Sequence, residues 1–165
     1  MSAKEHHHHG HKALKVGVLT ASDSRSAETD ESGRVIRDLL TAAGHRVEYY
    51  EVLPDDPARI RGALLDHLQT LDAVIVNGGT GIAARDSTIE AVRVLLDKEL
   101  EGFGELFRYL SYQEIGSAAF LSRAVAGIAA GKIVASLPGS PGACRLAMEK
   151  LLLPELGHMA HLLKL

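Results

Sequence analysis

Apolar positions along the chain follow two spacings in turn, one typical of strands and the other of helices. Three short runs, at positions 15–20, 45–53 and 72–77, predict strands. The run 72–77 is apolar without alternation, which is typical of a strand covered by helices on both faces. We therefore expect this run near the centre of a parallel sheet.

Segments with helical spacing separate these runs. Residues 32–43 carry apolar side chains on one face and end at Gly44, a residue type that readily takes the left-handed conformation at a helix end. Residues 57–70 predict a second helix, with Asp56 as its N-cap and Pro57 at its first position. Each helix therefore has one face suited to packing on the sheet.

The second half of the chain is less regular. Ser87 and Glu90 have the spacing of a capping box and predict that a third helix begins there. Glycines flank residues 103–115, which form either a short helix or an excursion toward an active site. The segment 124–139 predicts two strands joined by a hairpin at Gly131, which makes one strand of the sheet antiparallel.

Residues 139–153 start a further helix, which Pro154 is expected to separate from the terminal segment 155–165. Strands and helices that alternate in this way predict an α/β fold, a three-layer αβα sandwich around a mostly parallel sheet with one antiparallel strand. Ligands bind such sheets beyond the carboxyl ends of the strands. Three polar loops are expected there, at positions 20–24, 77–88 and 136–142.

Composition limits the class of protein. The 165 residues are 46% hydrophobic and 24% charged, so residues 14–165 are expected to form one globular domain. A net charge of −3 gives no basic face for nucleic acid or an anionic membrane. No apolar stretch reaches the roughly 18 residues that span a bilayer, and we see no signal peptide. We expect a cytoplasmic protein.

Two features are left out of the predicted site. Histidines crowd positions 6–9 and 11, where nothing positions them, so residues 1–13 are expected to be a disordered tail that binds metal adventitiously or belongs to an expression tag. The single Cys144 is expected to be structural, because no neighbour in sequence is suited to activating its thiol.

The stretch GGTG, at positions 78–81, directly follows the central run. Gly78, Gly79 and Gly81 permit positive φ angles and let backbone N–H groups converge on an anion. A phosphate cradle is one interpretation, and a tight strand-to-helix turn that needs glycine for its geometry is the other. The loop matches neither GxxxxGK[ST] nor GxGxxG, so neither a Walker-type nucleotidase nor a dinucleotide enzyme is predicted.

Two aspartates are candidates for binding a cation. Asp86 either caps the following helix or holds Mg²⁺ between its carboxylate and a bound phosphate. Asp55 is free for a second metal or substrate contact once Asp56 caps its own helix, with a solvated turn residue as the alternative. Arg85 is either a phosphate contact or a solvated charge.

The two other loops also carry polar groups. Ser22, Asp23 and Ser24 either form a cap or turn or contact a ligand. Gly139 and Ser140 expose donors just before a helix, which again suits an anion.

Outside the loops, Glu105 either reaches the same crevice or stays on the surface. Arg108 and Arg123 are either anion or interface contacts or members of ordinary salt bridges.

Six stretches occur in order: TASDS, LPDD, GGTGIAARDST-EA, GFGELFRYLS-EIG, LSRAVAG and LPGSP. Together they resemble the molybdenum cofactor biosynthesis protein B family, MoaB, within the MoaB/Mog superfamily of molybdopterin adenylyltransferases. The resemblance covers nearly everything from Lys15 to His158. The stretches GFGELFR and LSRAVAG favour the MoaB branch over the Mog branch.

The resemblance implies a three-layer α/β fold that assembles as a homotrimer or a homohexamer. It implies Mg²⁺-dependent adenylylation of molybdopterin by ATP with release of pyrophosphate, and the metal-insertion protein of the pathway as a partner. Positioning, metal charge and N–H donors would dominate such a reaction, because several negative charges meet in it.

The resemblance also assigns residues. Asp55 and Asp86 match the family's two functional aspartates and are expected to hold Mg²⁺ and to orient the substrate. The residues expected to bind the substrates are Ser22, Asp23, Ser24, Gly78, Gly79, Thr80, Gly81, Arg85, Thr88, Glu105, Pro138, Gly139, Ser140 and Pro141.

The chain departs from the family's pattern in one loop. It has RDSTIE where many active relatives have RDVTPE, and Ala83 and Ala84 replace positions that are often polar. A non-catalytic oligomer that binds a pterin or a nucleotide in the same pathway is the alternative function. A nucleotide phosphatase on the same fold is the third.

Overall fold

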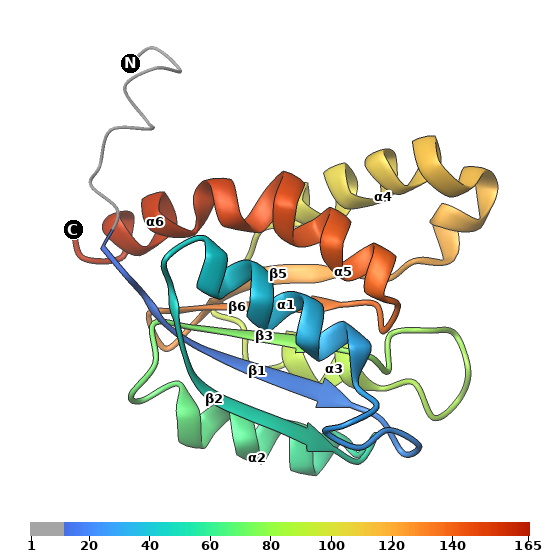
Figure 1. Ribbon diagram of the computed structural model, residues 1–165, viewed down its shortest axis with the longest axis horizontal. Coiled ribbons are helices and arrows are strands. Elements are labelled where there is room, and N and C mark those ends of the chain that lie inside the picture. Colours follow the sequence, from blue (N-terminus) through green and yellow to red (C-terminus); the bar gives the residue numbers. More distant parts are fainter. Residues whose placement is uncertain (1–11) are drawn as a thin grey trace.

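A six-stranded sheet forms the middle of the part of the chain that this computed structural model describes, residues 12–165 (Figure 1). The order of its strands is β2-β1-β3-β6-β5-β4. The prediction for residues 1–13 falls outside the described residues except for Lys12 and Ala13. The strands are β1 Lys15–Ala21, β2 Arg46–Leu53, β3 Ala73–Asn77, β4 Lys98–Glu99, β5 Val125–Ala129 and β6 Lys132–Leu137.

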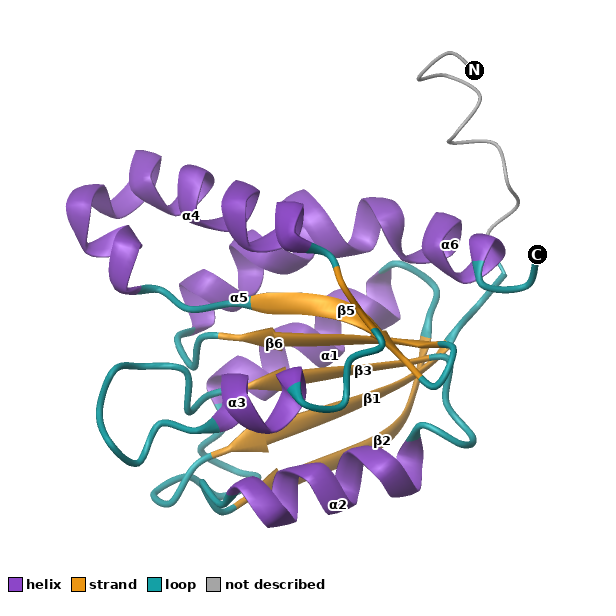
Figure 2. Cartoon of the chain, turned by 180° about the vertical axis from the view of Figure 1, so that it is seen from behind, coloured by secondary structure: helices purple, strands orange, loops and turns teal. Residues whose placement is uncertain are grey.

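Helices cover both faces of the sheet, as Figures 1 and 2 show from opposite sides. One face carries α1, α4, α5 and α6, and the other carries α2 and α3. The predicted three-layer α/β sandwich is therefore confirmed. The helices are α1 Glu31–Ala42, α2 Pro57–His67, α3 Thr88–Arg93, α4 Glu101–Ile115, α5 Pro141–Ala147 and α6 Leu153–Leu162, with a 3₁₀ segment η1 Gly116–Leu121 and a π-helical segment η2 Met148–Leu152.

The strands β2, β1, β3 and β6 run parallel, and β5 is antiparallel to both of its neighbours. The prediction of one antiparallel strand is therefore confirmed. A two-residue turn joins β5 to β6, and its residues Ala130 and Gly131 have φ angles of 49° and 72°. Positive φ at both positions is typical of tight hairpins.

The strand order reverses beside β1. The chain leaves β1 through α1 to reach β2 on one side, and it then returns through α2 to β3 on the other side. The helices that follow β1 and β3, α1 and α3, lie on opposite faces of the sheet, so the loops that lead to them diverge. A crevice at the carboxyl ends of these two strands follows from the topology.

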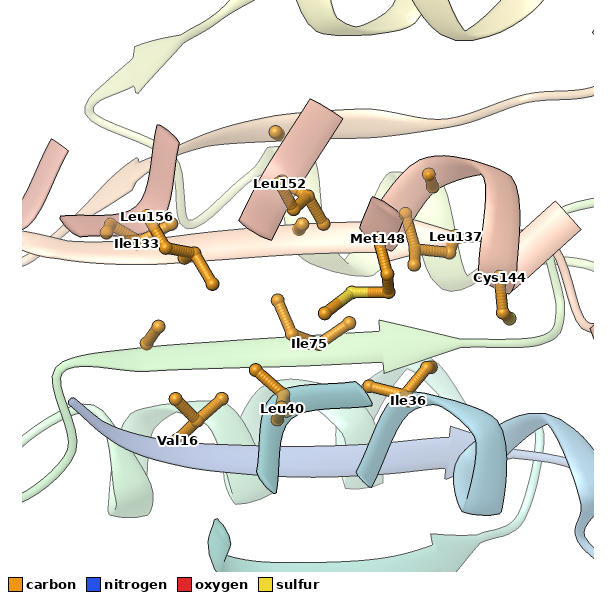
Figure 3. Close-up of a cluster of buried hydrophobic side chains, with 14 of the residues drawn as sticks. Val16, Ile36, Leu40, Ile75, Ile133, Leu137, Cys144, Met148, Leu152 and Leu156 are labelled. Carbon is orange, nitrogen blue, oxygen red and sulfur yellow. The ribbon is translucent and has the colours of Figure 1, made fainter. Parts of the chain in front are cut away.

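Burial on both faces confirms the central place of β3. Ala73 and Ile75 face one core cluster, whereas Val74 and Val76 face the other, and all four are fully buried. Figure 3 shows how side chains of α1 and of the C-terminal helices meet β1, β3 and β6 in the first cluster. The absence of alternation in this run therefore reflects helices on both sides.

Local signals set several helix ends. Asp56 accepts the backbone N–H of Arg59 at 2.9 Å and caps α2, with Pro57 at the first position as predicted. Gly44 follows α1 with a φ of 85°, also as predicted. The alternatives for residues 103–115 are settled in favour of a helix, α4.

The predicted capping box at Ser87 is wrong. Ser87 occupies the N-cap position of α3, but its side chain makes no capping hydrogen bond, and its buried Oγ has no partner among the described residues. Glu90, the expected second member, pairs instead with Arg123. The guanidinium offers Glu90 a stronger, charge-assisted partner than a helix N–H group.

The predicted break at Pro154 is also wrong. The chain stays helical from Pro141 through Pro154 to Leu162, because η2 widens the backbone just before the proline. A proline removes one N–H group and crowds the carbonyl group four residues earlier. A π-helical turn accommodates both effects without ending the helix. No helix among residues 12–165 combines the length and the apolar character needed to cross a bilayer.

Two helical leucines provide a test of this core. Leu40 of α1 is fully buried, whereas Leu65 of α2 is 53% exposed. We expect Leu40→Ala to lower the free energy of unfolding by about 2–5 kcal/mol, because it removes a side chain that packs against the sheet. Leu65→Ala is expected to change it by less than about 1 kcal/mol. Denaturant unfolding of both variants measures the difference, and equal losses would contradict the assigned core.

Candidate functional site

Four loops meet at the carboxyl edge of the parallel strands. They follow β1, β2, β3 and β6, and they enclose a hollow of about 280 Å³. The expectation that three polar loops share one rim is confirmed, and Asp55 brings in a fourth loop after β2. The residues that line the hollow are Ala21, Ser22, Asp23, Ser24, Arg25, Asp55, Gly78, Gly79, Arg85, Asp86 and Gly139.

Seven of the predicted substrate-binding residues do not line this hollow. Thr80 and Thr88 are buried behind the loop, and Gly81 lies beside the Asp86 carboxylate. Pro138 and Ser140 line a neighbouring hollow of about 190 Å³ instead.

The two remaining predicted residues are Pro141 and Glu105. Pro141 begins α5, whose N-cap is Ser140, and the Ser140 side chain accepts the N–H of Ala143 at 3.2 Å. Glu105 is exposed on α4. It does not line the hollow, so its role in substrate binding stays a prediction.

The glycines of the loop after β3 are required by the geometry. Gly78 and Gly79 have φ angles of 89° and 63°. A Cβ on Gly78 would collide with the carbonyl oxygen of Ala21, and one on Gly79 would lie 2.5 Å from Asp55 Oδ1. The turn therefore needs glycine for its geometry, and the same glycines let the Asp55 carboxylate approach the backbone. The phosphate-cradle interpretation is compatible with this turn and stays a prediction.

Asp86 closes its own loop. Its Oδ2 accepts the N–H of Ala83 at 3.0 Å, and its N–H donates to the carbonyl oxygen of Ala83 at 2.9 Å. A Cβ on Gly81 would lie 2.6 Å from this Oδ2 atom. The helix-cap alternative for Asp86 is therefore wrong, because its carboxylate binds within the loop and Ser87 occupies the N-cap position.

The surroundings of Asp55 disfavour a negative charge on its carboxylate. Its N–H donates to Asp23 Oδ1 at 2.9 Å, and its own Oδ1 is buried without a hydrogen-bond partner among residues 12–165. Burial raises the pKa of Asp55, and the negative charges of Asp86 and Asp23 raise it further. The nearby Arg85 acts in the opposite direction. This carboxylate lacks a positive or donating neighbour close enough to satisfy it.

These carboxylates fit a divalent cation held jointly with a ligand. No group of three or more potential metal-binding side chains occurs within residues 12–165, so a metal cage made by the protein alone is not present there. Mg²⁺ commonly uses one or two carboxylates and completes its shell with phosphate oxygens and water. The unpartnered Oδ1 of Asp55 beside Asp86 matches that requirement.

Arg25 is a site residue that the sequence reasoning missed. Its Nη2 donates to the carbonyl oxygen of Gly139 at 2.8 Å, and Ser32 Oγ donates to the same oxygen at 2.6 Å. These contacts tie the turn after β6 to the loop after β1. The only sequence signal was the position of Arg25 directly after the SDS stretch, since its partner is 114 positions away.

A buried polar network supports the end of β1 beneath the hollow. Asp30 is only 2% exposed, and it accepts hydrogen bonds from Thr20 Oγ1 at 2.6 Å, from Tyr50 Oη at 2.7 Å and from the N–H of Gly33 at 2.9 Å. Asn77 at the end of β3 donates to Thr20 Oγ1 at 2.8 Å. The two strands on either side of the reversal point are therefore linked by side chains as well as by the backbone.

Comparisons with known proteins agree with this architecture. Residues 17–158 match the family model described as "Probable molybdopterin binding domain". The molybdenum cofactor biosynthesis protein B of Bacillus cereus is 53% identical over 162 residues, which cover 96% of each chain.

Solved structures agree with both the sequence match and the fold. A crystal structure of a molybdenum cofactor biosynthesis protein B superposes with a TM-score of 0.91 at 53% identity, covering 93% of this chain and 97% of that one. The tungsten cofactor synthesizing protein MoaB from Pyrococcus furiosus gives a TM-score of 0.82 at 41% identity, covering 94% and 98%. The chain therefore belongs to the molybdenum cofactor biosynthesis protein B family, within the broader group of molybdopterin-binding domains.

Proposed function

We propose that this chain acts in molybdenum cofactor biosynthesis as a molybdopterin adenylyltransferase. It would transfer the adenylyl group of ATP to molybdopterin and release pyrophosphate. The family and its relatives support the pathway. The hollow supports the reaction, because carboxylates, two arginines and the backbone of glycine residues line one space that is open to solvent.

One observation carries the proposal: the buried, unpartnered Oδ1 of Asp55 lies in a hollow shared with the carboxylates of Asp23 and Asp86. Like charges gathered in this way destabilise one another unless a cation joins them. Asp55 and Asp86 would hold Mg²⁺ together with phosphate oxygens of the substrates. When bound, Mg²⁺ supplies positive charge that neutralises the phosphates as they approach each other.

The chain's own residues would bind and orient the two substrates. A phosphate oxygen of molybdopterin forms a bond to the α-phosphorus of ATP, and the bond from that phosphorus to the pyrophosphate oxygen breaks. No protein nucleophile is needed. The phosphate oxygens would contact the backbone of Gly78 and Gly79, the hydroxyls of Ser22 and Ser24, and the guanidinium of Arg85. These contacts would hold the reacting groups in line.

A homotrimer or homohexamer is part of the proposal, with the pathway's metal-insertion protein as the acceptor of the product. Support for assembly comes from large apolar side chains that α4 and η1 expose. Single exposed apolar residues are ordinary, but a contiguous group favours an interface. The group consists of Leu106, Tyr109, Tyr112, Ile115, Phe120 and Leu121, which are 44% to 77% exposed.

The first test replaces Asp86. An asparagine retains an oxygen that can accept the N–H of Ala83, so the loop is expected to keep its shape while it loses one negative charge. We expect Asp86→Asn to lower pyrophosphate release from purified molybdopterin, ATP and Mg²⁺ by at least about 100-fold.

Asp97→Asn is the matched control for this test. Asp97 also accepts a backbone N–H, that of Ala130 at 2.8 Å, but it lies away from the hollow. Its replacement is expected to leave turnover unchanged. Tight binding of both substrates to the native protein without pyrophosphate release would favour the non-catalytic binding oligomer, and ATP hydrolysis without pterin would favour a phosphatase.

The second test concerns the charge of Asp55. Its pKa is raised by burial first and by Asp86 and Asp23 next, so Asp86→Asn is expected to lower this pKa. Arg85→Gln removes a positive charge and is expected to raise it. Titration of the side-chain carboxyl carbon by ¹³C NMR measures both directions, and Asp66→Asn on α2 serves as the control.

The raised pKa of Asp55 also determines whether this residue stabilises or destabilises the fold as the pH rises. Because the folded-state pKa of Asp55 lies above its unfolded-state value, the folded state binds more protons in the window between the two values. Asp55 therefore destabilises the fold as the pH rises through that window, and Asp55→Asn is expected to remove this loss. A native protein whose stability showed no contribution from Asp55 there would contradict the assignment.

A further inference from the structure

Arg123 binds the loop after β3 from the side that faces η1 and β5. Its Nε donates to the carbonyl oxygen of Thr80 at 2.9 Å. Its Nη2 donates to the carbonyl oxygens of Gly81 at 2.8 Å and of Asp86 at 3.3 Å. One guanidinium therefore holds both ends of the stretch that carries Arg85 and Asp86.

Glu90 completes the set of partners. Its carboxylate pairs with Nη1 of Arg123 and also lies 3.5 Å from Nη2. The hydrogen bond from Arg123 lowers the pKa of Glu90, so this carboxylate stays ionised to a lower pH than an ordinary glutamate. The planar fork of the guanidinium is thus fixed between the first turn of α3 and the loop that precedes it.

The backbone of Arg123 has a firm anchor. The next two residues, Ala124 and Val125, are buried, and Val125 pairs with Ser136 of the central strand β6. Ala124 also packs closely against α4, since a Cβ on Gly104 would lie 3.0 Å from its carbonyl oxygen. Arg123 therefore connects the loop after β3 to a backbone segment that is anchored in the sheet.

Peptide geometry gives these contacts a consequence for the hollow. In a trans peptide the N–H group points opposite to the carbonyl group of the same unit. The carbonyl groups of Thr80, Gly81 and Asp86 turn toward Arg123, so the N–H groups of Gly81, Ile82 and Ser87 turn away from it. Arg123 thereby sets the rotation of two peptide units at the start of the loop and of the unit that follows Asp86.

We propose that Arg123 is a positioning residue for this site: it fixes the loop after β3 through three backbone carbonyl groups and so places the Asp86 carboxylate for the bound substrates. Its catalytic consequence rests on the proposed adenylyl transfer. Lysine cannot replace it, because an ammonium group lacks the planar fork that reaches Thr80 and Asp86 together.

The test compares Arg123→Ala and Arg123→Lys with Arg93→Ala. Arg93 is the matched control, since its guanidinium makes a two-pronged pair with Glu99 at 2.9 Å for both contacts, whereas that of Arg123 binds the loop. Backbone amide exchange of residues 80–87 is the first readout. We expect faster exchange in both Arg123 variants and native exchange in Arg93→Ala.

Turnover is the second readout. A misplacement of about 1 Å can cost 100-fold in rate, so we expect Arg123→Ala to lower kcat by about 100-fold with a smaller change in KM. Added guanidinium ion at non-denaturing concentrations is expected to restore part of the rate in Arg123→Ala and none in Asp86→Asn. A purely structural role would not produce this selective rescue.

The outcomes separate the two proposals. If loop exchange is faster in the Arg123 variants but even the native protein shows no turnover, the proposed adenylyl transfer is wrong and the positioning role stands. Native loop exchange in both Arg123 variants overturns the positioning role, whatever the turnover. If Arg123→Ala is globally unstable, Arg123→Lys decides by the same exchange measurement, because it keeps the charge and the aliphatic stem.

Discussion

The parallel pairing of β2, β1, β3 and β6 is the constraint on which the rest of the molecule depends. It brings four strand ends to one edge of the sheet, and the reversal of strand order beside β1 opens a crevice there. Apolar packing on both faces keeps this arrangement fixed, since every residue of β3 is buried. The loops can therefore carry polar groups that would be costly to bury elsewhere.

Side chains of both charges line this edge of the sheet. Three carboxylates, Asp23, Asp55 and Asp86, line the hollow itself. Burial raises the pKa of Asp55, and the charges of Asp86 and Asp23 raise it further. Arg25 and Arg85 also line the hollow, and Arg25 and Arg123 bind backbone carbonyl groups of the loops around it. The hollow thus gathers negative charge that a cation and phosphate groups would balance, while arginines hold its walls. The net charge of −3 for the whole chain gives no sign of this local pattern.

The loop after β3 shows how glycine, carboxylate and arginine depend on one another. Gly79 leaves room for the Asp55 carboxylate, and Gly81 leaves room for that of Asp86. Asp86 closes the loop from within by accepting the N–H of Ala83, and Arg123 holds it through carbonyl groups. Space at the glycines, the hydrogen bond to Asp86 and the contacts of Arg123 therefore together fix a stretch that contains no regular secondary structure.

The sequence by itself determined the elements whose signals are local. The unbroken apolar run of β3, the cap at Asp56 and the left-handed Gly44 each depend on neighbours within a few residues, so pattern and capping rules find them. The same rules failed at Ser87, because its expected partner Glu90 is taken by Arg123 from 33 positions away. Only the tertiary structure decided which charged groups face the hollow and which hold its loops. The reason is that contacts between distant segments follow from the packing of the sheet and produce no pattern in the sequence.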